Sequence, residues 1–352
     1  MAQSPPPGAM PPPNPLRIGL VLPLRGPQAP LGQAVQQAAM LAMFGNLPSP
    51  VALLFYDTTG DGGAVAAVQA AIGDGAQIIL GPLFAAELRA VKASGPLAVP
   101  LLSLSNDWQQ ASVATSILGP TPQAEIPQSL QQLAQSGVRM LHILAPDTPY
   151  GQTVLQSAKN FAGQSALVIQ SAQLYPSQNT AALQKAVEKL AADLPQPGTA
   201  GAEYHAVLIA ETPARLAAME AVWQAMQTQT GRSTMPRLIG LSLWAEADPS
   251  NFPILGQTLL PLPEYAAAQN FNGRYQQYFN AAPPGLAFIA YSAVQMLSRT
   301  AQWQFAGAPP AGWPALWAEG QPLDTEFGGM RQLPPGIWQR PLRLQTWRQG
   351  GF

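Results

Sequence analysis

The chain has 352 residues, of which 47% are hydrophobic and 10% are charged, and its formal net charge at pH 7 is −1. Because there is no basic excess to follow a phosphate backbone, nucleic-acid binding is not expected. The sequence contains no cysteine, which excludes disulfides, thiolate nucleophiles and zinc–thiolate sites. The apolar content is too high for a disordered chain and sufficient for one large core or two ordinary ones.

Residues 1–15, "MAQSPPPGAMPPPNP", hold seven prolines. Such a segment cannot form a helix or a central strand, so we predict a semi-extended tether. The segment contains no apolar signal-peptide core. No apolar run in the chain approaches the 18 residues of a membrane-spanning helix, so direct membrane insertion is not expected.

From Leu16 onward, short apolar runs alternate with segments whose apolar residues recur at helical spacing. In chain order, the first unit has expected strands at 16–24, 51–58, 76–81 and 97–105, and expected helices at 31–44, 63–75 and 84–94. Continuous apolar strands that alternate with helices predict a parallel sheet covered on both faces.

The same alternation returns after residue 119, with expected strands at 138–146, 166–175, 204–210 and 237–242, and helices at 124–137, 150–163, 179–194 and 212–227. Beyond Pro261 the pattern changes to two helices separated by "AAPPG", a stretch rich in Gly, Pro and Trp, and a last strand at 340–348. These late helices have no sheet of their own, so they must pack on one of the two units.

Polar or tightly turning segments follow two strands of the first unit. In open α/β sheets, ligands bind beyond the carboxyl ends of strands and near helix N-termini. The turn that contains Leu83 and Phe84 is therefore a candidate site, although it could be only a tight strand-to-helix connection. The next strand ends in a second candidate cluster, whose Asn or Asp could instead cap a short helix: Ser103, Ser105, Asn106, Asp107 and Trp108.

Equivalent positions in the second unit are Asp147 and Tyr150 in "LAPDTPYG", and Glu211 in "IAETPARL". Asp147 could also cap the following helix, and Thr212 is a natural cap beside Glu211. Trp244 follows the strand "RLIGLS" and is placed to line a cleft.

Catalysis is not expected. The two histidines, His142 and His205, lie inside apolar strands, whereas a catalytic base should lie at a strand end or in a loop. The sequence has no nucleophile elbow, no zinc-protease motif, no phosphate-binding loop and no dinucleotide fingerprint. We therefore expect no catalytic residues, no metal site and no cofactor.

The order of motifs resembles a known family. "IGLVLPLRGPQAPLGQAVQQAAMLA", "GPLFAAELRAV", "VPLLSLSND", "LGPTPQAE" and "LAPDTPYG" look like the type I periplasmic binding-protein fold. Among proteins with this fold, the sequence resembles the penicillin-binding protein activator family. Its members are bacterial lipoproteins related to the leucine/isoleucine/valine receptors of ABC transporters. The resemblance runs from about residue 16 to residue 349.

The resemblance implies an α/β fold of two Rossmann-like, parallel-sheet lobes joined by three hinge crossings, near 119–120, 260–262 and 327–328. Residues 16–119 and 263–326 would form lobe 1, and residues 121–260 and 329–352 would form lobe 2. Residues 1–15 would be the tether that follows a lipidated cysteine.

Two functions follow as expectations from the resemblance. The first is a non-catalytic, periplasmic lipoprotein domain that activates a penicillin-binding protein in peptidoglycan synthesis. The alternative is an extracellular receptor that delivers an amino acid or related solute to an ABC permease. Ala85 stands at a hydroxyl position of the amino-acid receptors, and Gln123 and Leu241 or Ser242 stand at their acidic positions. These departures favour the activator, with Gln123 as a further cleft residue.

Overall fold

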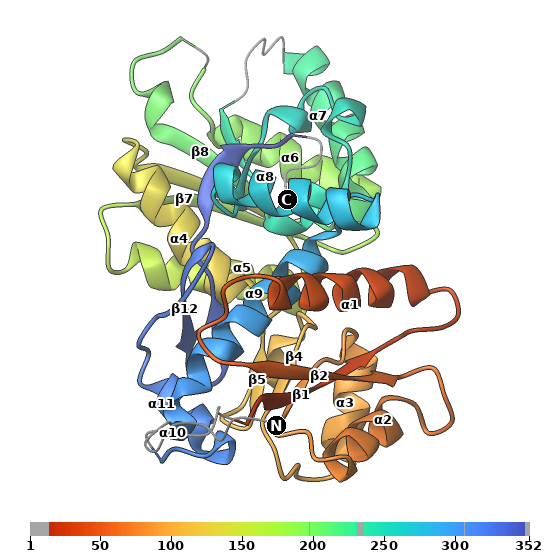
Figure 1. Cartoon of the computed structure of the whole chain (residues 1–352). Coiled ribbons are helices and arrows are strands. Elements are labelled where there is room, and N and C mark those ends of the chain that lie inside the picture. The colour runs from red at the N-terminus through yellow and green to blue at the C-terminus, as the bar shows by residue number, and fades with distance from the viewer. Residues whose placement is uncertain (1–13, 197, 231–235, 306, 349–352) are drawn as a thin grey trace, which may run out of the picture.

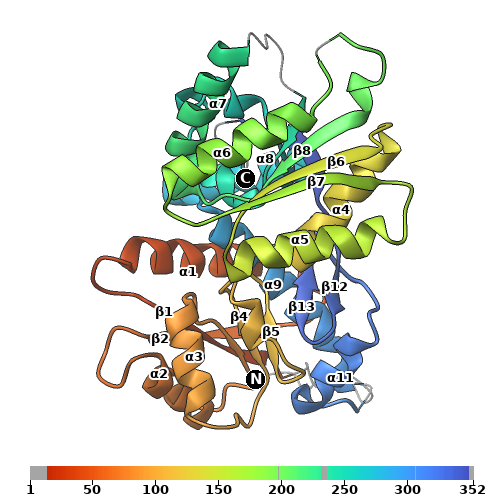
Figure 2. The ribbon, with the colours of Figure 1, turned by 180° about the vertical axis from the view of Figure 1, so that it is seen from behind.

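The computed structural model describes residues 14–196, 198–230, 236–305 and 307–348, so most of the expected tether lies outside the described residues. The chain forms two α/β lobes, one above the other, each with helices on both faces of its own sheet (Figures 1 and 2). Most strand pairs are parallel. The predicted fold class, two Rossmann-like lobes, is therefore confirmed.

The lobe 1 sheet has eight strands. In spatial order they are β11 (Leu323–Thr325), β12 (Gly328–Leu333), β13 (Ile337–Gln339), β5 (Thr115–Ile117), β4 (Leu101–Ser103), β3 (Ile78–Leu80), β1 (Leu16–Leu22) and β2 (Val51–Asp57). The strands from β13 to β2 are mutually parallel, whereas β12 runs antiparallel to both of its neighbours, β11 and β13.

The helices of lobe 1 cover both faces of this sheet. One face packs against α2 (Gly63–Gly73) and α3 (Ala85–Ala93). The opposite face packs against four helices: α1 (Ala29–Met43), α8 (Tyr265–Phe279), α9 (Gly285–Thr300) and α11 (Trp313–Ala318). A short helix, α10 (Gln302–Phe305), follows α9. The late helices thus pack on lobe 1, and Trp313, Trp317 and Trp338 are buried there.

The lobe 2 sheet has six strands, in the spatial order β14 (Arg343–Thr346), β10 (Leu259–Leu262), β9 (Arg237–Ile239), β8 (His205–Ile209), β6 (Met140–Pro146) and β7 (Val168–Tyr175). Only β14 is antiparallel to its neighbour. One face packs against α4 (Pro122–Gln135) and α5 (Pro149–Ala162), and the other against α6 (Thr180–Asp193) and α7 (Leu216–Thr230). Within the described ranges, no helix has the length and apolar character needed to cross a membrane.

The chain crosses between the lobes after β5, after β10 and after β13. The third crossing differs from the expected one near 327–328. Strands β12 and β13 pair within the lobe 1 sheet, where β13 lies beside β5, and only β14 joins the lobe 2 sheet. The crossing therefore consists of residues 340–342, and the expectation that residues 329–339 belong to lobe 2 is wrong. Hydrogen bonding of β13 to β5 holds these residues in lobe 1.

One glycine in each lobe lets a helix approach the strand that precedes it. A Cβ atom on Gly32 of α1 would lie 2.0 Å from the carbonyl oxygen of Pro23, and a Cβ on Gly151 of α5 would lie 2.0 Å from that of Pro146. Only glycine fits at such a distance. The two helices therefore begin directly over the strand ends that face the other lobe, which positions the loops of the candidate site.

Candidate functional site

A cavity of about 170 Å³ lies between the lobes, next to all three crossings. A cavity of comparable volume, about 150 Å³, binds benzene in another protein. Strand-end loops of lobe 1, the first turn of α4, the short 3₁₀ helix 242–246, the start of α9 and the crossings all contribute to it. Its lining residues are Leu83, Phe84, Leu104, Asn106, Gly119, Pro120, Thr121, Ala124, Glu125, Ser242, Leu243, Glu246, Pro261, Pro263, Gly285, Leu286, Ile289, Trp338, Arg340 and Leu342.

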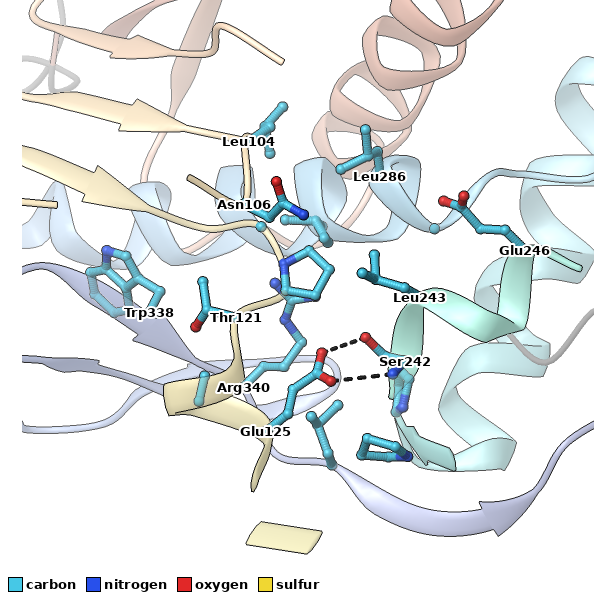
Figure 3. Close-up of a pocket in the computed structure, with 18 of the residues that line it drawn as sticks. Leu104, Asn106, Thr121, Glu125, Ser242, Leu243, Glu246, Leu286, Trp338 and Arg340 are labelled. Carbon is cyan, nitrogen blue, oxygen red and sulfur yellow. Dashed lines mark hydrogen bonds between the residues drawn. The ribbon is translucent and has the colours of Figure 1, made fainter. Parts of the chain in front are cut away.

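Glu125 is the buried carboxylate of this cavity. Ser242 donates to both of its oxygens: the backbone N–H to Oε2 at 3.2 Å, and the hydroxyl to Oε1 (Figure 3). Burial raises the pKa of Glu125 to about 7, because desolvation of the charged form outweighs the two bonds from Ser242 and the attraction of Arg340. Glu125 therefore titrates near neutral pH, and both of its carboxylate oxygens already accept a hydrogen bond.

Arg340, in the third crossing, brings a positive charge to the cavity. Its side chain extends alongside Glu125 (Figure 3) and donates to the carbonyl oxygen of Leu118. Burial lowers the pKa of Arg340 to about 10, while the charge of Glu125 acts in the opposite direction. The guanidinium remains protonated at neutral pH, so the cavity holds one fixed cation beside one titrating acid.

The rest of the cavity is mostly apolar. Leu243 and Leu286 project toward each other from opposite lobes, and Glu246 lies near them at the end of the 3₁₀ helix (Figure 3). Glu246 is exposed, and partial desolvation raises its pKa above the ordinary value. Two buried polar atoms of the lining, Thr121 Oγ1 and Trp338 Nε1, have no hydrogen-bond partner in the described part of the chain.

Three residues chosen from the sequence line this cavity: Leu83, Phe84 and Asn106. The two serines before Asn106 serve the loop itself. The Ser103 hydroxyl donates to the Pro82 carbonyl oxygen at 2.9 Å and accepts from the Ser105 N–H at 3.1 Å. Ser105 Oγ in turn accepts a hydrogen bond from the backbone N–H of Asp107 at 3.1 Å. Both serines are buried and neither lines the cavity.

The expected acidic residues are also engaged elsewhere. Asp107 forms an ion pair with Arg89, with Oδ2 2.6 Å from Nη1. The side chain of Asp147 accepts from Gln152 Nε2 at 2.7 Å. Neither carboxylate is part of the cavity lining.

Glu211 is buried in lobe 2 and does not line the cavity. Its carboxylate accepts from the Tyr175 hydroxyl and from the Thr212 N–H, and its carbonyl oxygen accepts from the indole N–H of Trp244 at 2.7 Å. Trp244 is fully buried and stacks at a tilt against Trp347. Glu211 and Trp244 thus form part of the lobe 2 core, apart from the cavity.

The two lobes touch through an aromatic pair. Trp108, in a 3₁₀ helix of lobe 1, lies 5.9 Å from Tyr150 of α5 in lobe 2, measured between ring centroids. Burial raises the pKa of Tyr150 well above its ordinary value, so the phenol stays neutral at physiological pH. Neither ring lines the cavity, but their contact joins lobe 1 to lobe 2.

The residues that sequence reasoning missed lie at the crossings. The family resemblance placed Gln123 at an acidic position, yet Gln123 does not line the cavity, and the acid two residues later, Glu125, does. A signal was available, since "TPQAE" ends in the only acidic residue of that helix's first turn. Arg340 was missed because its segment was assigned entirely to lobe 2.

The two histidines contact each other inside lobe 2. His142 Nε2 lies 2.9 Å from His205 Nδ1, the rings stack, and His142 Nδ1 lies 2.9 Å from Ser171 Oγ. Both lie in the lobe 2 sheet outside the cavity lining. Among the residues whose placement is described, no group of three or more His, Asp or Glu could hold a metal ion.

Two sheet-based lobes, three crossings and a cavity between the lobes define a two-lobed binding protein. The family model for periplasmic binding proteins matches residues 15–312, and the chain belongs to that family. Membership places the protein in the periplasm or another extracytoplasmic compartment. No curated protein is similar enough in sequence to match the chain.

Solved structures with the same fold include both transport and regulatory proteins. A putative branched-chain amino acid ABC transporter protein from Rhodospirillum rubrum is 18% identical, with a TM-score of 0.74 over 96% of this chain and 99% of that one. The LpoA C-domain from Haemophilus influenzae, a regulator of PBP1A, is 16% identical, with a TM-score of 0.65 over 95% and 98%. An ABC transporter substrate-binding protein from Desulfitobacterium hafniense, in complex with Leu, is 18% identical with a TM-score of 0.65 over 96% and 99%. Likeness at these identities shows the shared fold.

Proposed function

We propose that this protein is a non-catalytic regulator of the cell envelope that binds and activates a penicillin-binding protein. It would act as a rigid two-lobed body through protein–protein contact, anchored by a lipid ahead of the Pro-rich residues 1–15. The LpoA domain, which has the same fold, is described as a regulator of PBP1A. That likeness makes the role compatible with the fold.

The observation that carries the proposal is the internal pairing of Glu125, the buried carboxylate of the cavity, and of Glu211 in the lobe 2 core. Both oxygens of Glu125 accept from Ser242, and the Glu211 carboxylate accepts from Tyr175 and Thr212. A desolvated ammonium group needs a negatively charged partner, since burying a charge without one is costly. Glu125, with a pKa of about 7 and the cation of Arg340 beside it, is a weak partner for an ammonium group, and Glu211 does not line the cavity. Trp108 of lobe 1 also contacts Tyr150 of lobe 2 directly.

The test uses the purified chain and purified penicillin-binding proteins of the same organism. Surface plasmon resonance should detect specific binding to at least one of them. The chain should also raise the rate at which that synthase polymerises or cross-links glycan strands. Absence of both binding and stimulation across all the synthases would overturn the proposal.

A second candidate function is solute reception for an ABC permease, and one observation favours it. The cavity carries the cation of Arg340 on one side and the exposed carboxylate of Glu246 on another, separated by apolar walls. That arrangement suits a small molecule with a carboxylate, an ammonium group and an apolar body. Closure of the lobes on such a ligand would then signal to the permease.

A thermal-shift screen against amino acids and peptidoglycan fragments separates the two functions. A ligand at about 100 times its Kd adds roughly 2.7 kcal/mol to the free energy of unfolding and raises the Tm. If one compound raises the Tm, and Glu246→Gln removes the shift without lowering the Tm of the free protein, the receptor is supported. No shift for any compound counts against the receptor and leaves the synthase-binding assay to decide on the regulator.

A further inference from the structure

The outer face of helices α1 and α8 is almost without charge. Residues 26–56, which include the whole of α1, contain no Asp, Glu, Lys or Arg. The only charged residue of α8 is Arg274, which is paired with Glu326 at 2.7 Å. The two helices lie side by side, since the Tyr275 hydroxyl donates to Gln37 Oε1 at 2.7 Å (Figure 1). Such a surface is unusual, because soluble proteins normally intersperse charges over their exposed helices.

Large apolar side chains are exposed where these two helices end. Phe44 is 71% exposed and Tyr278 is 60% exposed, and their rings stack with centroids 6.0 Å apart. Met40 and Met43, on the last turn of α1, are 37% and 41% exposed. We call these four residues the Phe44–Tyr278 patch. It joins segments more than 200 residues apart in the chain.

The Tyr278 ring of the patch packs, through a chain of aromatic contacts, on the lobe 1 core. Tyr278 packs against Phe279, whose ring centroid lies 4.8 Å from that of Tyr275, and Tyr275 in turn contacts Phe271 in the lobe 1 core. A ring fixed in this way loses little conformational freedom when a partner covers it. The patch is therefore preorganised for binding.

The composition of the patch indicates a protein partner. Interface cores are depleted in charged residues and enriched in aromatic residues and methionine. A nucleic acid or an anionic membrane surface would require basic residues, which this face lacks. The two classes of partner that remain are another protein with an apolar face and a second copy of this chain.

The absence of charge favours the second copy. In a two-fold symmetric dimer the same surface meets itself, so residues near the axis face their own copies and any charge there would face a like charge. A face of Gln, Ala, Met and aromatic residues avoids this repulsion. The formal net charge of −1 also keeps long-range repulsion between two copies small. A face designed for a charged partner would instead carry complementary charges.

We infer that the protein forms a two-fold symmetric dimer through the Phe44–Tyr278 patch on the α1/α8 face of lobe 1. This inference goes beyond the proposed function and does not depend on it. None of the four patch residues lines the cavity, so substitutions in the patch leave the cavity lining unchanged.

Sedimentation velocity over a wide concentration range, with the complete chain, tests the dimer. The wild type should dimerise reversibly, and Phe44→Ser and Met43→Glu should each raise the dimer Kd by roughly tenfold or more. Tyr204→Ser is the matched control, because Tyr204 is 49% exposed on lobe 2, and it should leave the Kd unchanged. Circular dichroism and the Tm confirm that each variant is folded.

Two results would overturn the inference. One is a wild-type protein that stays monomeric at every concentration reached, which would leave the patch to another protein. The other is a dimer whose Kd is the same in Phe44→Ser, Met43→Glu and the wild type, which would place the dimer contact elsewhere.

Discussion

Gln128 and Gln132, one turn apart on α4, form side-chain hydrogen bonds to the backbone of the third crossing. Gln128 donates to the Arg340 carbonyl oxygen at 3.0 Å and accepts from the Leu342 N–H at 3.2 Å. Gln132 donates to the Leu342 carbonyl oxygen at 3.0 Å and accepts from the Leu344 N–H at 3.0 Å. The two amides pair with this segment as a neighbouring strand would. They fix the crossing to lobe 2, and with it the position of Arg340.

Replacement of Gln132 by Ala should therefore destabilise the protein. It removes both hydrogen bonds to the crossing, and a third to the Gln128 carbonyl oxygen, and leaves partly buried backbone groups without partners, which costs about 2–3 kcal/mol. Urea unfolding monitored by circular dichroism measures the loss as a lower midpoint at an unchanged slope. The control is Gln131→Ala, on the exposed side of the same helix, for which a change of no more than about 0.5 kcal/mol is expected. Equal midpoints for the two variants would show that the crossing is held by other contacts.

Glu125 should make the stability of the protein depend on pH. Its pKa is raised to about 7 in the folded protein, so between its unfolded value near 4.5 and pH 7 the folded state binds more protons than the unfolded state. The contribution of Glu125 to the free energy of unfolding is therefore complete below about pH 4.5. It falls as the pH rises to 7, by about 3 kcal/mol in all. Glu125→Gln should remove this loss and be more stable than the wild type at pH 8.

The histidine pair changes the stability with pH in the opposite direction to Glu125, so the two effects must be measured separately. Burial lowers the pKa of His142 to about 4, so its contribution to stability is present above the unfolded value near 6.5 and is lost as the pH falls to 4. Measurements of Tm from pH 4 to 8 should show a steeper rise with pH in Glu125→Gln than in the wild type. Identical pH profiles for the two proteins would contradict a buried, titrating Glu125.

Much of the fold follows from local patterns in the sequence. The buried strands β1, β6 and β8 are continuous apolar runs, and their helices have apolar residues at helical spacing, so both units could be recognised. The strands that were missed are short or locally atypical. β5 has three residues, β12 begins with two glycines, and β13 is preceded by Gly336. Their pairing depends on contacts with segments distant in sequence.

The candidate site was less predictable for the same reason. The rule that ligands lie beyond strand ends selected Leu83, Phe84 and Asn106, which line the cavity. Glu125 and Arg340 meet only because the third crossing returns to α4, where Gln339 Nε2 bonds to the Ala124 carbonyl oxygen across 215 positions. No local sequence pattern predicts that Glu125 and Arg340 lie close together. The hydroxyls of Ser103 and Ser105 were attractive as ligand groups, but the loop uses them for its own backbone.

The contact between Trp108 and Tyr150 should help to keep the lobes together. An aromatic pair contributes about 0.5–1.5 kcal/mol beyond the area that it buries, so Trp108→Ala should shift the population toward more open forms. Small-angle X-ray scattering should then give a larger radius of gyration than for the wild type. Val113→Ser, at an exposed position of the same lobe, serves as the control. An unchanged radius for Trp108→Ala would mean that the crossings alone set the separation of the lobes.

Gly151 should tolerate no side chain. A Cβ atom there would lie 2.0 Å from the Pro146 carbonyl oxygen, so Gly151→Ala must push the start of α5 away from β6. Overpacking in a tight contact of this kind typically costs about 1–3 kcal/mol, and more where the backbone must move. Gly273→Ala on α8 is the matched control, because no described atom outside the local helix backbone and the two neighbouring residues lies within 4 Å of its Cβ position. There, alanine should stabilise the helix by up to about 1 kcal/mol. Thermal unfolding should thus give Tm changes of opposite sign for the two substitutions, whereas a stable Gly151→Ala protein would show that α5 can shift without loss of packing.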